Sequence, residues 1–233
     1  MPATPATPAA PIGSPGQRLS AFERLRSLPK SFSIEQLSLL CDLAPHMAAK
    51  YASRWIEAGL IVPAGPRVGY YANLVADPAQ SRSSAWRTQA LLYTYPTATM
   101  VGASVLASAG WVTQIPRETQ IAVLAPARRA RVDGFDVSAR TRRWFERTHA
   151  FSRPGEQGLR ELTPAMALAD AYARADTWHP DPDDLEIPTE DLPELVSAFG
   201  ALGAAMPEHL RELVDGDMAG DAAASAACAC RSR

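Results

Sequence analysis

The chain has few of the residues on which disulfide frameworks and zinc sites depend. It contains three cysteines and four histidines in 233 residues. Cys41 falls in a predicted core helix, whereas Cys228 and Cys230 lie in an Ala-rich end, so neither a disulfide framework nor a four-ligand zinc site is expected. This cysteine usage predicts a reducing, cytoplasmic location.

Several catalytic patterns are also missing. No Gly-rich phosphate loop of the Walker or dinucleotide type occurs. Lys30 and Lys50 are the only lysines, so the Glu-x-Lys element of metal-dependent nucleases is absent, although Asp133 and Asp136 could supply carboxylates. His149 has no evident Ser or Cys nucleophile as a partner. We therefore predict a protein that is not an enzyme and needs no cofactor.

Carboxylates gather around Trp178, at Asp176, Asp181, Asp183 and Asp184. Oxygen ligands of this kind can hold a hard cation. Their spacing does not follow the calcium-loop pattern, which requires a central glycine and a closing glutamate. A solvated acidic loop is the favoured interpretation, and no metal site is predicted.

One long stretch carries no charge. It runs from Thr88 to Pro116 and includes Pro96 together with threonines, serines, glutamines and glycines. This polarity argues against a lipid-spanning helix. We expect the stretch to be buried in protein and predict no membrane partner.

Charge of each sign is distributed unevenly. Residues 1–80 hold 7 basic and 5 acidic side chains, residues 81–160 hold 12 and 5, and residues 161–233 hold 4 and 15, while the whole chain has a formal net charge of −2. The middle part is therefore a candidate polyanion-binding surface, and the end is not.

The residues between Ser33 and Tyr71 show the layout of a winged helix-turn-helix. Ser33 and Gln36 fit a capping box that starts one helix, and Pro45 suits the first position of the next because its missing N–H would have no intrahelical partner there. Asp42 to Ala44 form the break between the two helices, and the second ends at Gly59.

The second of these helices has two faces. Helical spacing turns Ala48, Tyr51, Ala52, Trp55 and Leu60 toward a core. The opposite face is small, polar and modestly basic, as a helix entering the DNA major groove requires. Its members are His46, Met47, Ala49, Lys50, Ser53 and Arg54.

Two strands, at Leu60 to Val62 and Val68 to Leu74, are expected to follow. Two prolines and a glycine between them predict a turn, and Arg67 in this turn is placed to meet a phosphate or the minor groove. Modules of this kind also serve as protein-docking domains, so duplex DNA and a protein partner both remain open.

The predicted fold class is α+β, with the N-terminal winged helix-turn-helix domain at 19–76 and a mixed α/β second domain at 85–215. Within the second domain we expect a helix over 98–109 and a strand over Thr119–Leu124. A hairpin with strands at 130–132 and 135–138 is predicted to turn at Asp133 and Gly134, and a helix is predicted over Ala165–Arg174. Disordered tails are predicted at 1–18, rich in Pro and Ala, and at 216–233, rich in Ala.

The middle part carries a candidate basic surface. Trp144 and Phe145 are interleaved with its arginines, a combination that can grip phosphates and stack a base. The same charges could instead pair with the acidic end of the molecule. The arginines of this candidate basic surface are Arg128, Arg129, Arg131, Arg140, Arg142, Arg143 and Arg147.

The order of these parts resembles a known family. The wing GLIVPAGPRVGYYANL is followed by the small-residue segment ATMVGASVLASAGWV, the strand QIAVLAP and the Arg-rich RRARVDGFDV. With LRELTPAMALADAYARADTWHPDPDDL, they make a chain that resembles the AbiEi family, the antitoxins of type IV toxin–antitoxin systems. The likeness spans roughly residues 20 to 187 and rests on the order of individually degenerate motifs.

This resemblance implies a transcriptional autorepressor that binds inverted repeats in its own promoter and counters a nucleotidyltransferase toxin without a stable complex. It implies base-edge contacts from Pro45, His46, Met47, Ala49, Lys50 and Ser53. It implies phosphate contacts from Arg54, Arg67, Tyr70 and Tyr71. The alternatives are a winged-helix protein-interaction module and a stand-alone regulator without a toxin partner.

Overall fold

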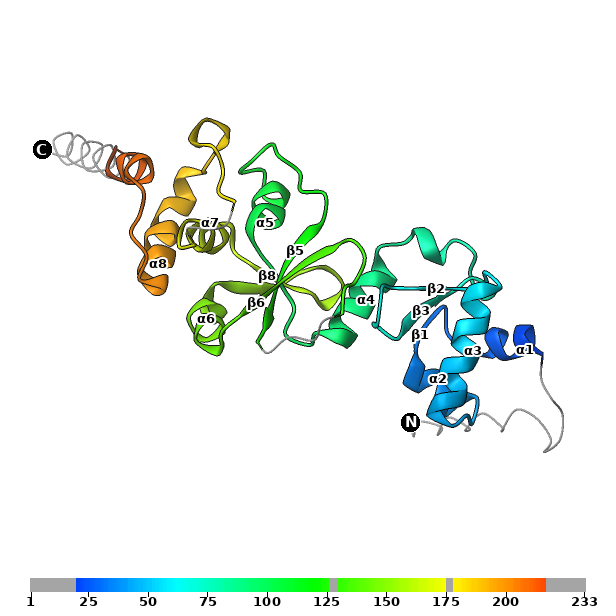
Figure 1. Cartoon of the computed structure of the whole chain (residues 1–233). Helices are drawn as coiled ribbons and strands as arrows, with labels where there is room; N and C mark the ends of the chain where they lie inside the picture. The colour runs from blue at the N-terminus through cyan, green and yellow to red at the C-terminus, as the bar shows by residue number, and fades with distance from the viewer. Residues whose placement is uncertain (1–19, 126–129, 175–177, 217–233) are drawn as a thin grey trace, which may run out of the picture. The chain divides into compact units, whose positions relative to one another are not determined.

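The structure is a computed structural model that describes residues 20–125, 130–174 and 178–216. Some predicted features therefore lie outside the described residues. They are the tail at 1–18, the tail at 216–233 except for Gly216, and Arg128 and Arg129. The fold is α+β and divides into two compact units (Figure 1). The first holds the described residues up to Val62 together with Tyr71–Arg82, and the second holds Pro63–Tyr70 and the residues from Ser83 onwards.

The first unit combines three short strands with three helices. The strands form a sheet in the order β1-β3-β2, with the last residue of β2 and the first of β3 assigned to the second unit. The helices are α1 (Ala21–Ser27), α2 (Ile34–Leu40) and α3 (Pro45–Glu57), and the strands are β1 (Ser31–Ser33), β2 (Ile61–Pro63) and β3 (Tyr70–Asn73), with a 3₁₀ turn η1 at Gln80–Arg82.

Capping boxes start the first two helices. The Ser33 hydroxyl accepts the Gln36 N–H while the Gln36 side chain accepts the Ser33 N–H, which confirms the predicted start of α2. Ser20 and Glu23 make the same reciprocal pair at α1, a helix that was not predicted. These bonds satisfy backbone donors that a helix leaves without partners in its first turn.

The core of the first unit is built from one side of each helix. Leu25 of α1, Leu37 of α2 and Trp55 of α3 are buried together with Phe32 of β1 and Ile61 of β2. At roughly 1.5–3 kcal/mol per buried large side chain, this cluster supplies most of the drive to fold the unit.

Asn73 ties the end of β3 to the chain between α1 and β1. Its side chain is fully buried, and Nδ2 donates to the carbonyl oxygens of Leu25 at 2.7 Å and Pro29 at 3.1 Å. Oδ1 accepts the N–H groups of Val75 and Ala76. A buried carboxamide with both ends engaged fixes these segments in one arrangement.

The second unit is built around a five-stranded mixed sheet in the order β6-β5-β4-β8-β7. Strand β4 runs antiparallel to β5 and parallel to β8, β5 runs parallel to β6, and β7 runs antiparallel to β8. The strands are β4 (Thr99–Met100), β5 (Thr119–Leu124), β6 (Phe135–Arg140), β7 (Ser152–Pro154) and β8 (Arg160–Leu162).

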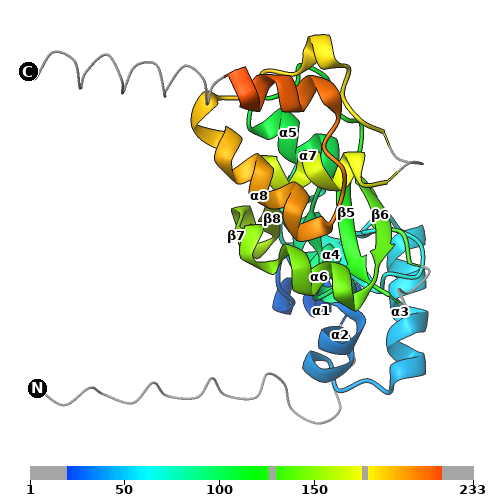
Figure 2. The same cartoon turned by 90° about the vertical axis from the view of Figure 1, so that its left-hand side faces the viewer.

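Helices α5, α7 and α8 pack together, with α7 in contact with both of the others (Figure 2). The helices of the unit are α4 (Ala85–Thr94), α5 (Gly102–Ser108), α6 (Arg142–Thr148), α7 (Pro164–Tyr172) and α8 (Leu192–Leu202), followed by helical residues 208–216. Short 3₁₀ turns occur at His149–Phe151, Glu156–Gly158, Pro182–Asp184 and Thr189–Asp191.

Helix α7 passes through the core of the second unit. Thr163 caps it and Pro164 occupies its first turn, which confirms the start predicted from these two residues. Met166 and Leu168 are fully buried and belong to the same cluster as Leu106 of α5 and Leu195 of α8.

The predicted helix over 98–109 is wrong at its beginning. Thr99 and Met100 form β4, the middle strand of the sheet, and the helix starts only at Gly102. Gly102 has φ +59°, and the Gln120 Oε1 atom accepts the Ala103 N–H at 2.7 Å. Pairing on both sides of β4 outweighs the helical spacing of its apolar residues.

The predicted hairpin at Asp133 and Gly134 is also wrong. Residues 130–132 form no strand, and β6 instead pairs in parallel with β5, with Thr119 opposite Phe135. The Asp133 N–H donates to the Ala64 carbonyl at 2.8 Å, and Phe135 N–H bonds back to Val132. Asp133 and Gly134 therefore form a turn that leads into β6, and they do not join two antiparallel strands as a hairpin would.

Within the part of the chain that the structure describes, no helix combines the length and apolar character needed to cross a membrane. The uncharged stretch from Thr88 to Pro116 forms most of α4, then β4, α5 and the residues that follow. Its large side chains Leu91, Leu106 and Trp111 are buried.

Candidate nucleic-acid interface

Helix α3 presents one polar face to solvent. Ala48, Ala52 and Trp55 are buried, and Tyr51 is half-buried against Trp55 with ring centroids 5.7 Å apart. The opposite face is formed by the residues that helical spacing predicted to point outward. Pro45, His46, Ala49, Lys50, Ser53 and Arg54 are exposed, and Met47 is half-buried.

The outer face of α3 carries its basic groups in one line. His46, Lys50 and Arg54 follow each other at intervals of four residues, which places them on the same side of the helix. Ser53, beside them, donates its hydroxyl to the Ala49 carbonyl at 3.1 Å. No carboxylate occurs in α3 before its last residue, Glu57, so the outer face is uniformly neutral or positive.

A tight turn sets α3 against α2. Asp42 adopts φ +48°, a left-handed conformation that Asp tolerates better than most residues. The Leu43 N–H donates to the Ser38 carbonyl at 2.9 Å, and the Ser38 hydroxyl donates to the Leu43 carbonyl. These bonds reverse the chain within the break that was predicted at Asp42 to Ala44.

The segment from Pro63 to Tyr70, which contains Arg67, belongs to the second unit. Arg67 is exposed, has φ +61° and follows Pro66 in a turn closed by the Val68 N–H and the Gly65 carbonyl at 3.5 Å. A proline followed by a residue with positive φ is the pattern of a type II turn. The turn holds the Arg67 side chain out to solvent.

Main-chain contacts hold this segment against the rest of the second unit. Gly65 lies so close to Arg131 that an added Cβ would stand 1.9 Å from the Arg131 carbonyl oxygen. Tyr70 donates its hydroxyl to the Gln89 Oε1 at 3.2 Å, and its ring lies 5.6 Å from that of Tyr93. The backbone of the turn is therefore engaged, whereas the Arg67 side chain is not covered.

Tyr70 and Tyr71 are both half-buried. Tyr71 packs on the ring of Phe32 in the first unit, with centroids 5.7 Å apart. Burial, together with the negative charge of Glu35, raises the pKa of the Tyr71 hydroxyl. Tyr71 therefore contributes to the core as well as to the strand on which it lies.

The candidate basic surface is partly internal. Arg140 is buried and forms an ion pair with Asp170, which was not anticipated as its partner. Arg131 bonds to Glu118 at 2.7 Å. Arg140 therefore lies in the interior and Arg131 at the surface, because an edge strand directs Arg140 inward.

The remaining described arginines of this group lie on α6. Arg142 bonds to Glu146 at 3.1 Å, and Arg147 donates to the Leu202 carbonyl at 2.8 Å. Arg143 is exposed. Within the described parts of the chain, only Arg140 pairs with a carboxylate from the acidic end, so the predicted internal charge pairing accounts for one arginine of the group.

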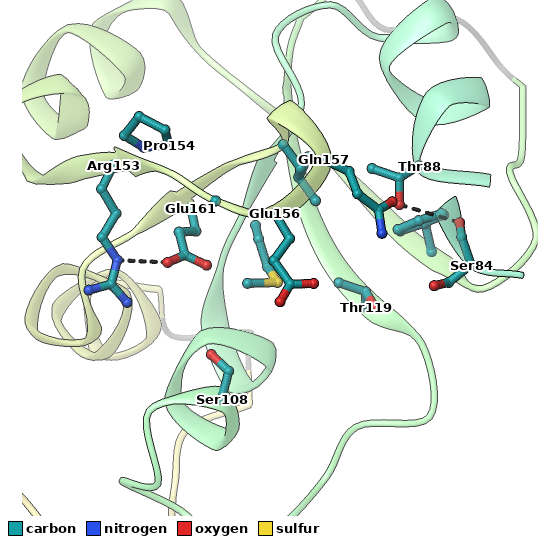
Figure 3. Close-up of a pocket in the computed structure, with 13 residues that line it drawn as sticks. Ser84, Thr88, Ser108, Thr119, Arg153, Pro154, Glu156, Gln157 and Glu161 are labelled. Carbon is teal, nitrogen blue, oxygen red and sulfur yellow. Dashed lines mark hydrogen bonds and ion pairs between the residues drawn. The ribbon is translucent and has the colours of Figure 1, made fainter. Parts of the chain in front are cut away.

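A cavity of about 750 Å³ lies elsewhere in the second unit (Figure 3). Glu156 and Gln157 project into it, and Arg153 bonds to Glu161 at 2.6 Å along its edge. Gln157 has φ +56°, an uncommon backbone conformation for this residue type. The cavity was not predicted, and the only local signal for it in the sequence is the pair Gly155 and Gly158 that flanks the tight turn.

The lining of this cavity is rich in polar side chains. Hydroxyls from Ser84, Thr88, Ser108 and Thr119 line the cavity together with the carboxylates of Glu156 and Glu161, and neither His nor Cys is among the lining residues that the structure describes. The arrangement offers hydrogen-bond donors and acceptors to a ligand.

Two of the acidic residues near Trp178 accept hydrogen bonds, and Asp176 lies outside the described residues. Asp181 accepts the Asp183 N–H at 3.2 Å, and Asp184 accepts the Thr113 N–H at 3.3 Å and the Thr113 hydroxyl. Over the described residues, no three of His, Cys, Asp and Glu are grouped so that they could hold a metal ion.

Comparisons with known proteins add little to this geometry. No family model matches the chain, and no curated protein matches it. Among solved structures, the chain is similar to the crystal structure of the RV2827C protein from Mycobacterium tuberculosis, at 18% sequence identity and a TM-score of 0.48. The match covers 84% of this chain and 74% of that chain. Function therefore has to be argued from the site.

Proposed function

We propose that the protein binds duplex DNA through a winged helix-turn-helix, with α2 and α3 of the first unit as the two helices and the β2–β3 connection, which is assigned to the second unit, as the wing. The observation that carries this proposal is the exposed face of α3. It is small and polar, has no carboxylate before Glu57 and lines up His46, Lys50 and Arg54. Such a face can enter the major groove and meet phosphates at its edges.

The roles of the side chains follow from their positions on α3. Pro45, His46 and Ala49 lie in the first half of the helix, where short side chains let the backbone approach the base edges. Lys50 and Arg54 reach further and bear the charge that attracts phosphate. Arg67 in the wing, exposed at its turn, would add a second phosphate contact.

We further propose that the protein represses its own promoter and acts as an antitoxin of the type IV kind, opposing a nucleotidyltransferase toxin encoded next to it. The support is the ordered set of sequence motifs that resembles the AbiEi family. One α3 helix carries few positive charges, so two copies of the protein would have to bind the two halves of an inverted repeat for tight and specific repression.

Binding of the full chain to a labelled duplex from its own upstream region tests the DNA-binding proposal. Fluorescence anisotropy across a salt series should show a steep loss of affinity as salt rises, and Lys50→Ala should weaken binding and flatten the slope of log K against log salt by about 1. Arg26→Ala removes an exposed positive charge from α1 and is the matched control.

Failure to bind at low salt would reject the DNA-binding proposal. Equal losses of DNA affinity in Lys50→Ala and Arg26→Ala would show that the DNA is attracted by positive charge in general. That outcome would contradict a specific role of α3. Co-expression with the neighbouring toxin tests the antitoxin role: growth should be rescued by the full chain without a stable complex forming.

Exposed apolar side chains on the first unit favour one alternative, a protein-docking module. Leu39 is 80% exposed and Leu40 is 56% exposed at the end of α2, and Phe22 on α1 is 53% exposed. Large exposed side chains of this kind are common at protein interfaces. Stable co-purification with the neighbouring gene product, in the absence of DNA affinity, would support docking over DNA binding.

A further inference from the structure

A second cavity, of about 350 Å³, has a strongly positive lining. Four arginines contribute to it, from β6, from α6 and from the residues after α7, while Asp170 is the only carboxylate among its described lining residues. Arginines therefore outnumber carboxylates among the lining residues that the structure describes. A hollow lined by one sign of charge concentrates ions of the opposite sign. Its arginines are Arg140, Arg143, Arg147 and Arg174.

Arg140 is held in place before any ligand arrives. Its Nη1 donates to the Ser138 hydroxyl at 2.9 Å and its Nη2 lies 3.4 Å from Asp170 Oδ2. The guanidinium also stands over the ring of Trp144, at 5.6 Å from the centroid. An arginine fixed by its neighbours loses little conformational freedom when it binds a ligand.

Trp144 completes this support. Its indole Nε1 donates to Asp170 Oδ1 at 2.6 Å, so that the two oxygens of Asp170 orient two different side chains. Asp170 thereby offsets part of the Arg140 charge.

Arg143 and Arg147 extend from one face of α6, because they are separated by four residues. Arg147 is anchored through its Nη1 to the Leu202 carbonyl at 2.8 Å. Neither side chain forms an ion pair with any residue that the structure describes. Their neighbour Arg142 differs, since it bonds to Glu146 and does not line the cavity.

We propose that this cavity binds a phosphate group, with Arg143 and Arg147 as its ligands beside the fixed Arg140. The planar guanidinium offers paired N–H donors that match two phosphate oxygens, which an ammonium group does not. The volume lies at the low end of small-molecule sites, so it suits a phosphate with a small attached group. The site lies wholly within the second unit and is independent of α3.

The phosphate could belong to a free phosphorylated molecule or to a nucleic-acid backbone, and titration calorimetry on the full chain separates these sources. The probes are inorganic phosphate, adenosine 5′-monophosphate, adenosine and a duplex of unrelated sequence. Phosphate and the monophosphate should bind saturably, whereas adenosine should not. Tighter binding of the monophosphate, without displacement by duplex, identifies a small phosphorylated ligand, and displacement by duplex identifies the backbone.

Two neighbouring variants make the test specific. Arg143→Glu should weaken phosphate binding tenfold or more, whereas Arg142→Glu, with the same charge change one residue away, should change it less than twofold. Both positions are exposed, so circular dichroism should show the native fold in each. Absence of saturable phosphate binding by the unmodified chain, or equal losses in the two variants, would overturn the proposal.

Phosphate binding at this cavity should also be independent of DNA binding by α3. Lys50→Ala should leave phosphate binding unchanged even where it abolishes binding of the upstream duplex. Loss of phosphate binding in Lys50→Ala would contradict an independent site in the second unit.

Discussion

Arg140 and Asp170 form an ion pair inside the second unit, with 3.4 Å between Nη2 and Oδ2 and with only 8% and 6% of their side chains exposed. The pair joins the end of β6 to α7. Removing two charges from water is costly, so such a pair adds little net stability, but a partner left alone in the interior is strongly unfavourable.

Replacing one member of this pair should therefore destabilise the second unit. Asp170→Asn leaves Arg140 charged and buried, and we expect the free energy of unfolding to fall by about 3–5 kcal/mol in urea denaturation. The combined change Asp170→Leu with Arg140→Met should be less damaging than either single change. A loss below about 1 kcal/mol in Asp170→Asn would show that water reaches the pair.

A side chain at Gly65 should disrupt the approach of the Pro63–Tyr70 segment to Arg131. Gly65→Ala places a Cβ 1.9 Å from the Arg131 carbonyl oxygen at φ +152°. Gly134→Ala is the control, because Gly134 also has positive φ, at +91°, with no atom within 4 Å of an added Cβ. Gly65→Ala should be about 1–3 kcal/mol more destabilising in chemical denaturation. Equal losses of stability in the two variants would mean that the Pro63–Tyr70 segment moves away from Arg131 without a cost in free energy.

Two substitutions at Arg67 distinguish the effect of backbone strain on stability from the effect of charge on DNA binding in the wing. With φ +61° after Pro66, it occupies a position that glycine adopts without steric cost. Arg67→Gly should be more stable than Arg67→Ala by about 1 kcal/mol in thermal denaturation. If Arg67 binds phosphate, both variants should lose DNA affinity equally. A more stable Arg67→Ala would contradict the assigned turn.

Tyr172 should make the second unit sensitive to alkali. Burial, followed by the charge of Asp181, raises the pKa of its hydroxyl, which bonds to the Pro180 carbonyl at 3.4 Å and lies 3.3 Å from His209 Nε2. Because the unfolded chain loses this proton first, the stabilisation is complete below about pH 10 and is lost as pH rises through the folded-state pKa.

Urea midpoints measured from neutral pH to above about pH 10 check this effect. Tyr172→Phe should show a shallower alkaline decline than the unmodified chain, and Asp181→Asn, which removes the repelling charge, should show an intermediate decline. An unchanged decline in Tyr172→Phe would assign the alkaline sensitivity to other groups.

Local signals in the sequence were sufficient for several elements. Ser33 with Gln36, Pro45 and Thr163 with Pro164 each act within one helical turn, so the starts of α2, α3 and α7 could be predicted from a few adjacent residues. The outward face of α3 followed from its spacing for the same reason. These features depend on bonds between near neighbours in the chain.

Only the tertiary structure decided the pairing of β4 and β6. Thr99 and Met100 are drawn into the middle of a sheet by β5 and β8, and Phe135 pairs with Thr119 instead of folding back across Gly134. Sequence periodicity cannot reveal these partners, because backbone hydrogen bonds between distant strands do not depend on the order of nearby side chains.

The same distinction applies to the candidate sites. The sequence alone determined which residues of α3 are small and basic and that the middle of the chain is rich in arginine. It also held one unused signal, since Asp170 is the only charged residue in an otherwise apolar helix. Only the fold decided that this carboxylate meets Arg140 and that Arg143 and Arg147 border one hollow, because burial and through-space charge bring together residues from separate elements.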